Sequence, residues 1–180
     1  MSQARNTVQQ SANGQHDTRR STDANAMALA GLRIAVGLFF TIFGQYKVFS
    51  KQFVDGGFQH YLESFLQGGA YPFMVPILKG ILAHGAMLMA YSVAYGEFLI
   101  GISLVIGLLS RIASIFGLAL MVAMWLSGGY PGAHAAFWMY WGASLNWSVF
   151  ALCFVALAIG HPEDVWSLRQ LWHRRKRPSF

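Results

Sequence analysis

Three ionisable side chains, one acidic and two basic, lie inside stretches of the sequence that are otherwise apolar. Glu97 lies in the run Tyr95–Arg111, and Arg33 and Lys47 lie in the run Leu29–Phe49. A charged side chain at membrane depth is costly unless it is paired or hydrated. The sequence therefore predicts that Glu97 pairs with a cation of the earlier run, and it leaves open whether that cation is Arg33 or Lys47.

Such a carboxylate can do two kinds of work. It can transfer protons or hold a ligand, which is the default expectation for an intramembrane acid. Alternatively, it can form a buried ion pair that only fixes the register of two helices. We expect Glu97 to have the functional role, and the structural alternative remains open.

Further polar groups lie next to aromatic residues. His84, His134 and Asn146 are candidates for hydrogen bonding to a cofactor, and segment 127–147 is rich in Trp, Tyr and Phe but contains no Lys or Arg. This segment has two compatible interpretations. It is either an aromatic belt at the headgroup level or the mouth of a cofactor site.

The composition indicates a membrane protein. Of the 180 residues, 55% are hydrophobic and 11% are charged, whereas a soluble domain has about 25% charged residues. The net charge of +6 comes largely from basic residues near the two ends of the chain. We attribute these to contact with the lipid bilayer and to topology rather than to nucleic acid. Cys153 is the single cysteine, which excludes an intramolecular disulfide and dithiol chemistry within this chain.

Four apolar segments are long enough, or nearly so, to cross the roughly 30 Å of a hydrocarbon core. They run from Leu29 to Phe49, from a start between Ile77 and Ala86 to Leu109, from Ile112 to Leu126, and from Ser144 to Gly160. The second segment is too long for one straight span, so either its first turns protrude from the bilayer or it bends at Gly80 or Gly85. The predicted fold is all-α, an integral membrane four-helix bundle.

Small residues recur at helical spacing in two of these segments and mark the faces that meet other helices. The stripes are Ala30, Arg33, Gly37, Phe40, Gly44 and Lys47 in the first segment, and Ala90, Ala94, Glu97 and Gly101 in the second. Both basic residues and the acid therefore face protein. The alternative for Arg33 and Lys47 is that their side chains extend to opposite headgroup layers. In the third segment, Ala113 and Gly117 predict a packing surface with little chemistry.

The remaining segments complete the domain organisation. Residues 1–26 are polar and predicted to be disordered, residues 27–162 form the four-span domain, and residues 163–180 form a basic amphipathic tail. In the first loop, apolar residues at helical spacing between Phe53 and Leu66 predict a short amphipathic helix on the membrane interface.

The charge distribution predicts the orientation. Three Arg precede the first span, five Lys or Arg follow the last, and Arg111 marks the corner between the second and third spans. The opposite side has only Lys51 and Lys79. The excess of Lys and Arg on cytoplasmic segments places both termini in the cytoplasm of a protein of the cell (inner) membrane.

The order and spacing of several motifs resemble the DoxX/DoxD family. These motifs are Leu32–Phe40 with Gly44 and Lys47, then Glu97–Gly101, then Gly107–Arg111, and finally Asn146-Trp147 and Gly160–Leu168. The resemblance implies a four-helix membrane protein. It also implies a link to redox complexes, since the family includes the small subunit of a thiosulfate:quinone oxidoreductase.

From this resemblance we expect a membrane subunit that binds quinone and receives electrons from the oxidation of a sulfur compound on the outer side. Glu97 would exchange protons, Arg33 or Lys47 would balance its charge, and His84, His134 and Asn146 would contact the cofactor. A second membrane or periplasmic redox subunit would be a partner, and a homo-oligomer is an option. The sequence suggests no metal site, and it disfavours haem because His84 and His134 do not form a matched axial pair. The alternative is a small proton-coupled transporter or a scaffold subunit without redox activity.

Overall fold

The computed structural model describes residues 2–160 together with residues 166 and 167, and it contains helices but no strand within that part of the chain. The long helices are α1 (Ser2–Phe49), α4 (Ala86–Ile106), α5 (Ser110–Gly128) and α7 (Leu145–Ile159). Shorter elements connect them: η1 (Phe53–Gly57), α2 (Phe58–Ser64), η2 (Phe65–Gly69), α3 (Val75–His84) and α6 (Met139–Gly142). The all-α prediction is confirmed for the described residues.

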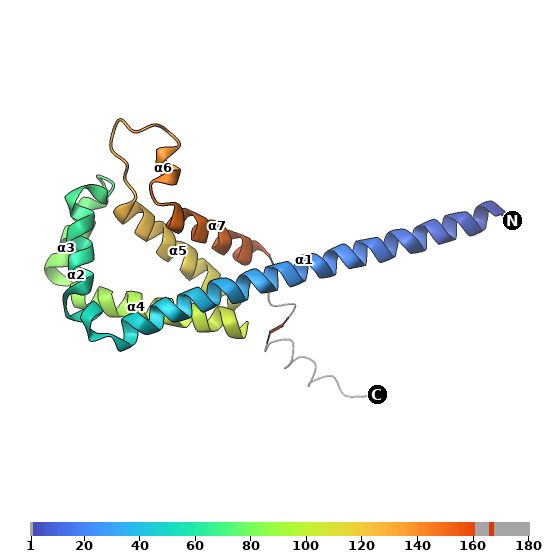
Figure 1. Ribbon diagram of the computed structural model, residues 1–180, viewed down its shortest axis with the longest axis horizontal. Helices are drawn as coiled ribbons and strands as arrows, with labels where there is room; N and C mark the ends of the chain where they lie inside the picture. Colours follow the sequence, from blue (N-terminus) through green and yellow to red (C-terminus); the bar gives the residue numbers. More distant parts are fainter. Residues whose placement is uncertain (1, 161–165, 168–180) are drawn as a thin grey trace.

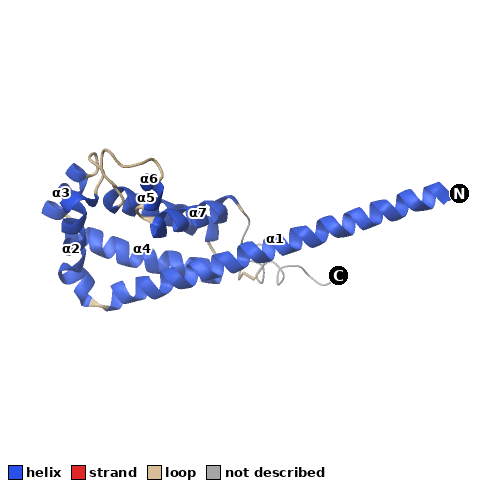
Figure 2. Ribbon diagram, turned by 45° about the horizontal axis from the view of Figure 1, so that its top comes forward, coloured by secondary structure: helices blue, strands red, loops and turns tan. Residues whose placement is uncertain are grey.

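The four long helices form two closely packed pairs, α1 with α4 and α5 with α7 (Figures 1 and 2). Between α1 and α4, Gly44 lies against Phe98 and Gly37 lies against Leu104. Higher numbers on one helix meet lower numbers on the other, so these two helices are antiparallel. In the second pair, Gly117 of α5 faces the ring of Phe154.

Glycines set the close approach of α1 and α4. A Cβ atom added at Gly44 would lie 2.5 Å from the backbone nitrogen of Phe98, and one at Gly101 would lie 2.4 Å from that of Thr41. The two backbones therefore touch at residues without side chains, as small-residue helix contacts in membranes do. Every residue of the two predicted stripes is buried except Lys47, which is partly buried. The prediction that the stripes face protein is confirmed.

Two glycines end the segments around α4. Gly85 leaves the helical conformation (φ −144°, ψ 14°) and separates α3 from α4, which confirms one of the two predicted bend positions. Gly107 has φ +73° and ends α4, donating its N–H to the carbonyl of Ser103. Because this left-handed conformation is easy only for glycine, the sharp corner into α5 depends on it.

Three helical stretches are long and apolar enough to cross a membrane: Ala24–Phe49, Ala86–Ile106 and Ser110–Gly128. Helix α7 has 15 residues and is about 22 Å long, which is shorter than a hydrocarbon core. The structure thus has four packed helices, of which three meet the length for a span.

The first loop differs from the prediction in the direction of its apolar face. Helix α2 lies across the end of the α1–α4 pair (Figure 1), as an interfacial helix would. Its apolar residues turn inward, however: Phe53, Phe58 and Leu62 are buried in a cluster with Leu78 and Ala90. The prediction that this face docks on lipid is wrong, because the end of α1 at Phe49 leaves the first half of α4 to be covered by protein.

The two terminal segments also bear on the predicted organisation. Residues 1–26 were predicted to be disordered, whereas α1 begins at Ser2 and its first half extends away from the bundle (Figure 1). The helix continues because adding a residue to an existing helix costs far less than starting one. The predicted tail, residues 163–180, lies outside the described residues apart from Trp166 and Ser167.

Candidate functional site

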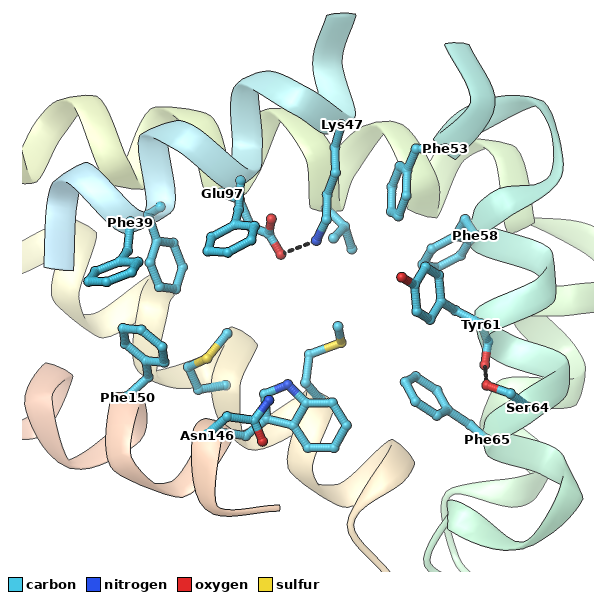
Figure 3. Close-up of a pocket in the computed structure, with 16 residues that line it drawn as sticks. Phe39, Lys47, Phe53, Phe58, Tyr61, Ser64, Phe65, Glu97, Asn146 and Phe150 are labelled. Carbon is cyan, nitrogen blue, oxygen red and sulfur yellow. Dashed lines mark hydrogen bonds and ion pairs between the residues drawn. The ribbon is translucent and has the colours of Figure 1, made fainter. Parts of the chain in front are cut away.

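A cavity of about 540 Å³ lies between the two helix pairs and is bounded at one end by α2 (Figure 3). Its walls are mostly aromatic. The lining residues are Phe39, Phe40, Phe43, Lys47, Phe53, Phe58, Tyr61, Ser64, Phe65, Val93, Glu97, Met121, Met124, Asn146, Trp147 and Phe150. This volume suits a small organic ligand, since such sites typically span about 300 to 1,000 Å³.

One ion pair forms the charged part of the cavity wall. Nζ of Lys47 donates a hydrogen bond to Oε1 of Glu97 at 2.7 Å. The Glu97 side chain is only 7% exposed and that of Lys47 is 20% exposed. The two charges neutralise each other, and both head groups point into the cavity (Figure 3). The choice that the sequence left open is thus resolved in favour of Lys47.

The contact at Gly44 explains why Lys47 reaches the acid. Gly44 lies against the peptide that joins Glu97 and Phe98, and Lys47 follows it by about one helical turn on the same face of α1. Arg33 lies 14 residues before Lys47, which places it about 21 Å away along the helix axis. The glycine contact sets the register, and the register decides the pairing.

Asn146 and Trp147 supply the wall opposite the ion pair. Both lie at the start of α7, and the Asn146 side chain is exposed within the lining of the cavity (Figure 3). Met121 and Met124 of α5 complete this side with polarisable thioether groups. The cavity therefore offers a hydrogen-bonding amide across from a cation and a carboxylate.

Aromatic rings close the two ends. Toward α2, Phe53 lies with its ring centroid 5.1 Å from Nζ of Lys47, a cation–π contact. Toward the α4–α5 corner, Phe40 packs edge-to-face on Phe150 at 5.8 Å and on Phe154 at 5.0 Å. These contacts separate the cavity from the opposite end of the bundle.

The structure brings together three of the predicted site residues, Glu97, Lys47 and Asn146. Arg33 is fully buried elsewhere, where its Nη2 donates to the carbonyl of Trp166 at 2.7 Å and its guanidinium lies against Gly107. Arg33 therefore lies at the corner between α4 and α5 and does not line the cavity.

The two predicted histidines also lie outside the cavity. His84 is exposed at the end of α3, and His134 is exposed in the loop between α5 and α6. Neither lines the cavity that holds Glu97. In the described part of the chain, no three His, Cys, Asp or Glu side chains gather in a way that could hold a metal ion.

A tyrosine cluster ties the loops near the cavity together. The ring centroid of Tyr71 lies 5.1 Å from that of Tyr130 and 6.5 Å from that of Tyr140. The backbone N–H of Tyr71 donates to Leu126 at the end of α5. Burial raises the pKa of Tyr71, with smaller contributions in the same direction from Tyr140 and Tyr130. The neutral phenol is therefore favoured in the folded protein.

The DoxX family profile matches residues 28–129, which is more than half of the sequence. The chain belongs to the DoxX family. Together with the three long apolar helices, this membership identifies a multi-pass membrane protein. No curated protein and no solved structure matches the chain significantly. Within the DoxX match lie Lys47 and Glu97, whereas Asn146 and Phe150 follow it.

Most of the cavity wall was not predicted from the sequence. The helical spacing of Phe53, Phe58, Tyr61 and Phe65 was visible in the sequence, but it was assigned to the membrane surface. Met121 gave no signal, because a methionine in an apolar helix is ordinarily a packing residue.

Proposed function

We propose that this DoxX protein binds a quinone in the cavity and serves as the membrane subunit of a redox complex. The observation that carries the proposal is the aromatic cavity with the Lys47–Glu97 ion pair on one wall and Asn146 on the other. A quinone is a flat ring with two opposite carbonyl oxygens. Flat rings pack well on aromatic side chains, and two facing polar groups suit two opposite carbonyls.

The charge of the cavity supports a neutral ligand. Lys47 and Glu97 cancel each other, and the other lining residues are uncharged. An anion would be repelled by the carboxylate and would lose its hydration among aromatic rings. Thiosulfate, a dianion, therefore does not suit this cavity, and we assign its oxidation to a partner subunit.

The lysine and the acid each have a role in binding. The ammonium group has three donor hydrogens, one of which is used by Glu97, so another can bond to a carbonyl of the ligand. Conversion of quinone to quinol consumes two electrons and two protons. Glu97 is a carboxylate in the ion pair, so it would first take up a proton from water and then pass it to the reduced carbonyl oxygen beside Lys47.

The electrons come from outside this chain. Two thiosulfate ions that join through a new S–S bond release the two electrons that one quinone takes up. Cys153, the single cysteine, lies partly buried in α7 and is absent from the cavity lining. The chain thus supports the ligand and proton side of the reaction, and a second redox subunit supplies the oxidation.

Quinone extraction tests the proposal. The full-length protein is purified with its native lipids, and extracted quinone is quantified for the wild type, Glu97→Gln and the control Glu63→Gln. Glu63 is an exposed acid outside the cavity. We expect bound quinone in the wild type and the control. In membranes that also contain the partner subunit, we expect loss of coupled quinone reduction in Glu97→Gln alone. Wild-type protein without quinone, together with unchanged activity of Glu97→Gln, would overturn the proposal.

One observation favours a second candidate, a proton-coupled transporter. An ion pair that is largely buried yet borders an open cavity is also the arrangement of a proton-coupled substrate site. Uptake of a substrate into proteoliposomes that requires Glu97, in protein that binds no quinone, would favour the transporter.

A further inference from the structure

The cavity has an open side, and the exposure of its lining residues locates it. Phe39 is 53% and Phe43 is 59% exposed on α1, and Tyr61 is 54% exposed on α2. Across from them, Asn146 of α7 is exposed as well. These lining residues bound a mouth between α1 and α7, next to α2.

The opposite side of the cavity is closed. Glu97 and Met121, which line the cavity from α4 and α5, are 5% and 6% exposed. A second groove of about 390 Å³ lies on the outside of the α4–α5 pair, includes Leu99 and Phe116, and shares only Val93 with the lining of the cavity. That groove contains neither Lys47 nor Glu97, so a ligand at the ion pair leaves the protein through the mouth between α1 and α7.

The surface around this mouth is apolar. On α1 the neighbouring exposed residues are Leu38, Ile42 and Tyr46, and on α7 they are Leu145, Val149 and Leu152. In the span Ala24–Phe49, Phe43 lies about 10 Å along the helix axis from the midpoint. This is still within the roughly 15 Å half-thickness of a hydrocarbon core. The mouth therefore faces the hydrocarbon region of the bilayer, and not water.

We infer that the ligand is a lipophile with a hydrocarbon tail, and that its tail leaves the cavity between Phe43 and Phe150 into the bilayer. This inference rests on the proposed quinone site and narrows its substrate class to long-tailed, membrane-dissolved quinones. The ring enters from the bilayer and reaches the ion pair, while the tail remains among Phe39, Phe43 and Phe150. Stacking of Phe39 on Phe43 at 6.5 Å gives the tail a continuous aromatic edge.

Photolabelling tests the position of the tail in the full-length protein. The probe is a benzoquinone whose decyl tail carries a diazirine, and its cross-links are mapped by mass spectrometry with and without excess decyl-benzoquinone. We expect competed cross-links on Phe39, Phe43 and the start of α7. Competed cross-links confined to Leu99 and Phe116 would overturn the tail position while leaving quinone binding intact. Absence of any competed cross-link would overturn the proposed function as well.

A matched pair of variants gives a second readout. Phe43→Trp enlarges a side chain at the mouth, whereas Ile42→Trp enlarges a neighbour that is similarly exposed, at 56% against 59%, but does not line the cavity. We expect Phe43→Trp to raise the Kd of decyl-benzoquinone about tenfold with less than about a twofold change for tail-less tetramethylbenzoquinone. Ile42→Trp should change neither value. Equal weakening of both quinones by Phe43→Trp would overturn the inference.

Discussion

Lys47 and Glu97 form a pair whose two members depend on each other unequally. The carboxylate is the more buried partner, at 7% exposure against 20% for the lysine side chain. Removing the lysine leaves a negative charge in an aromatic cavity, and removing the acid leaves a less buried cation that still contacts the ring of Phe53. Loss of Lys47 is therefore expected to destabilise the protein more than loss of Glu97.

We expect Lys47→Met to lower the free energy of unfolding by about 3 kcal/mol, because it strands the carboxylate of Glu97. Glu97→Gln keeps an oxygen that accepts from Lys47 and should cost about 1 kcal/mol. The double variant should be more stable than Lys47→Met alone, as measured by reversible denaturation in detergent. Purely additive effects in this double-mutant cycle would show that the two residues are not coupled.

At the scale of the helices, the α1–α4 contact depends on glycines that have no room for a side chain. Gly44→Ala places a methyl group against the backbone of Phe98 and should lower stability by about 1 to 3 kcal/mol. Gly31→Ala, on the same helix but with no atom within 4 Å of the new Cβ, should be neutral or stabilise by up to about 1 kcal/mol. Thermal denaturation compares the two variants, and equal losses would contradict the close contact at Gly44.

The raised pKa of Tyr71, in the tyrosine cluster beside α3, predicts that the free energy of unfolding falls at alkaline pH. The folded-state pKa of Tyr71 is raised above 10.0, so the folded protein holds this proton more tightly than the unfolded chain. Its contribution to stability is complete below about pH 10 and is lost as the pH rises through the folded-state pKa. We expect a loss of unfolding free energy above pH 10.0 that is smaller in Tyr71→Phe than in the wild type. An identical alkaline dependence in both proteins would exclude this role.

The sequence predicted the helices and their contact faces well, because small residues at helical spacing are a local pattern. The stripe from Ala30 to Lys47 follows from that pattern alone, and the length of the second segment narrowed the bend to Gly80 or Gly85. The cavity could not be predicted in the same way. Whether Phe53 and Phe58 face lipid or protein depends on where α1 ends relative to α4, and this offset is set by a glycine contact distant in the sequence.

The sequence left the choice between Arg33 and Lys47 open for the same reason. Both residues lie on the correct face of α1, and only the antiparallel register separates them. The two histidines illustrate a different limit of prediction from sequence. His84 and His134 were selected for their chemistry, but no pattern in the sequence ties either one to the helix pair that holds Glu97.

At the scale of the whole molecule, the distribution of Lys and Arg predicts that both termini lie in the cytoplasm. A fluorescent protein fused after Phe180 should therefore fluoresce, and alkaline phosphatase fused at the same residue should be inactive. A phosphatase inserted after Gly132, in the loop between α5 and α6, should be active. An active phosphatase at the C-terminus would mean that the chain crosses the membrane an odd number of times or is inverted.

The central claim is that the cavity between the helix pairs holds a quinone at the Lys47–Glu97 pair. Equilibrium binding of decyl-benzoquinone to the purified full-length protein tests it most directly, with Lys47→Met compared against the exposed control Lys79→Met. The account predicts saturable binding near one quinone per chain, weakened about tenfold by Lys47→Met and unchanged by Lys79→Met. Binding that does not saturate, or that is identical in all three proteins, would contradict it.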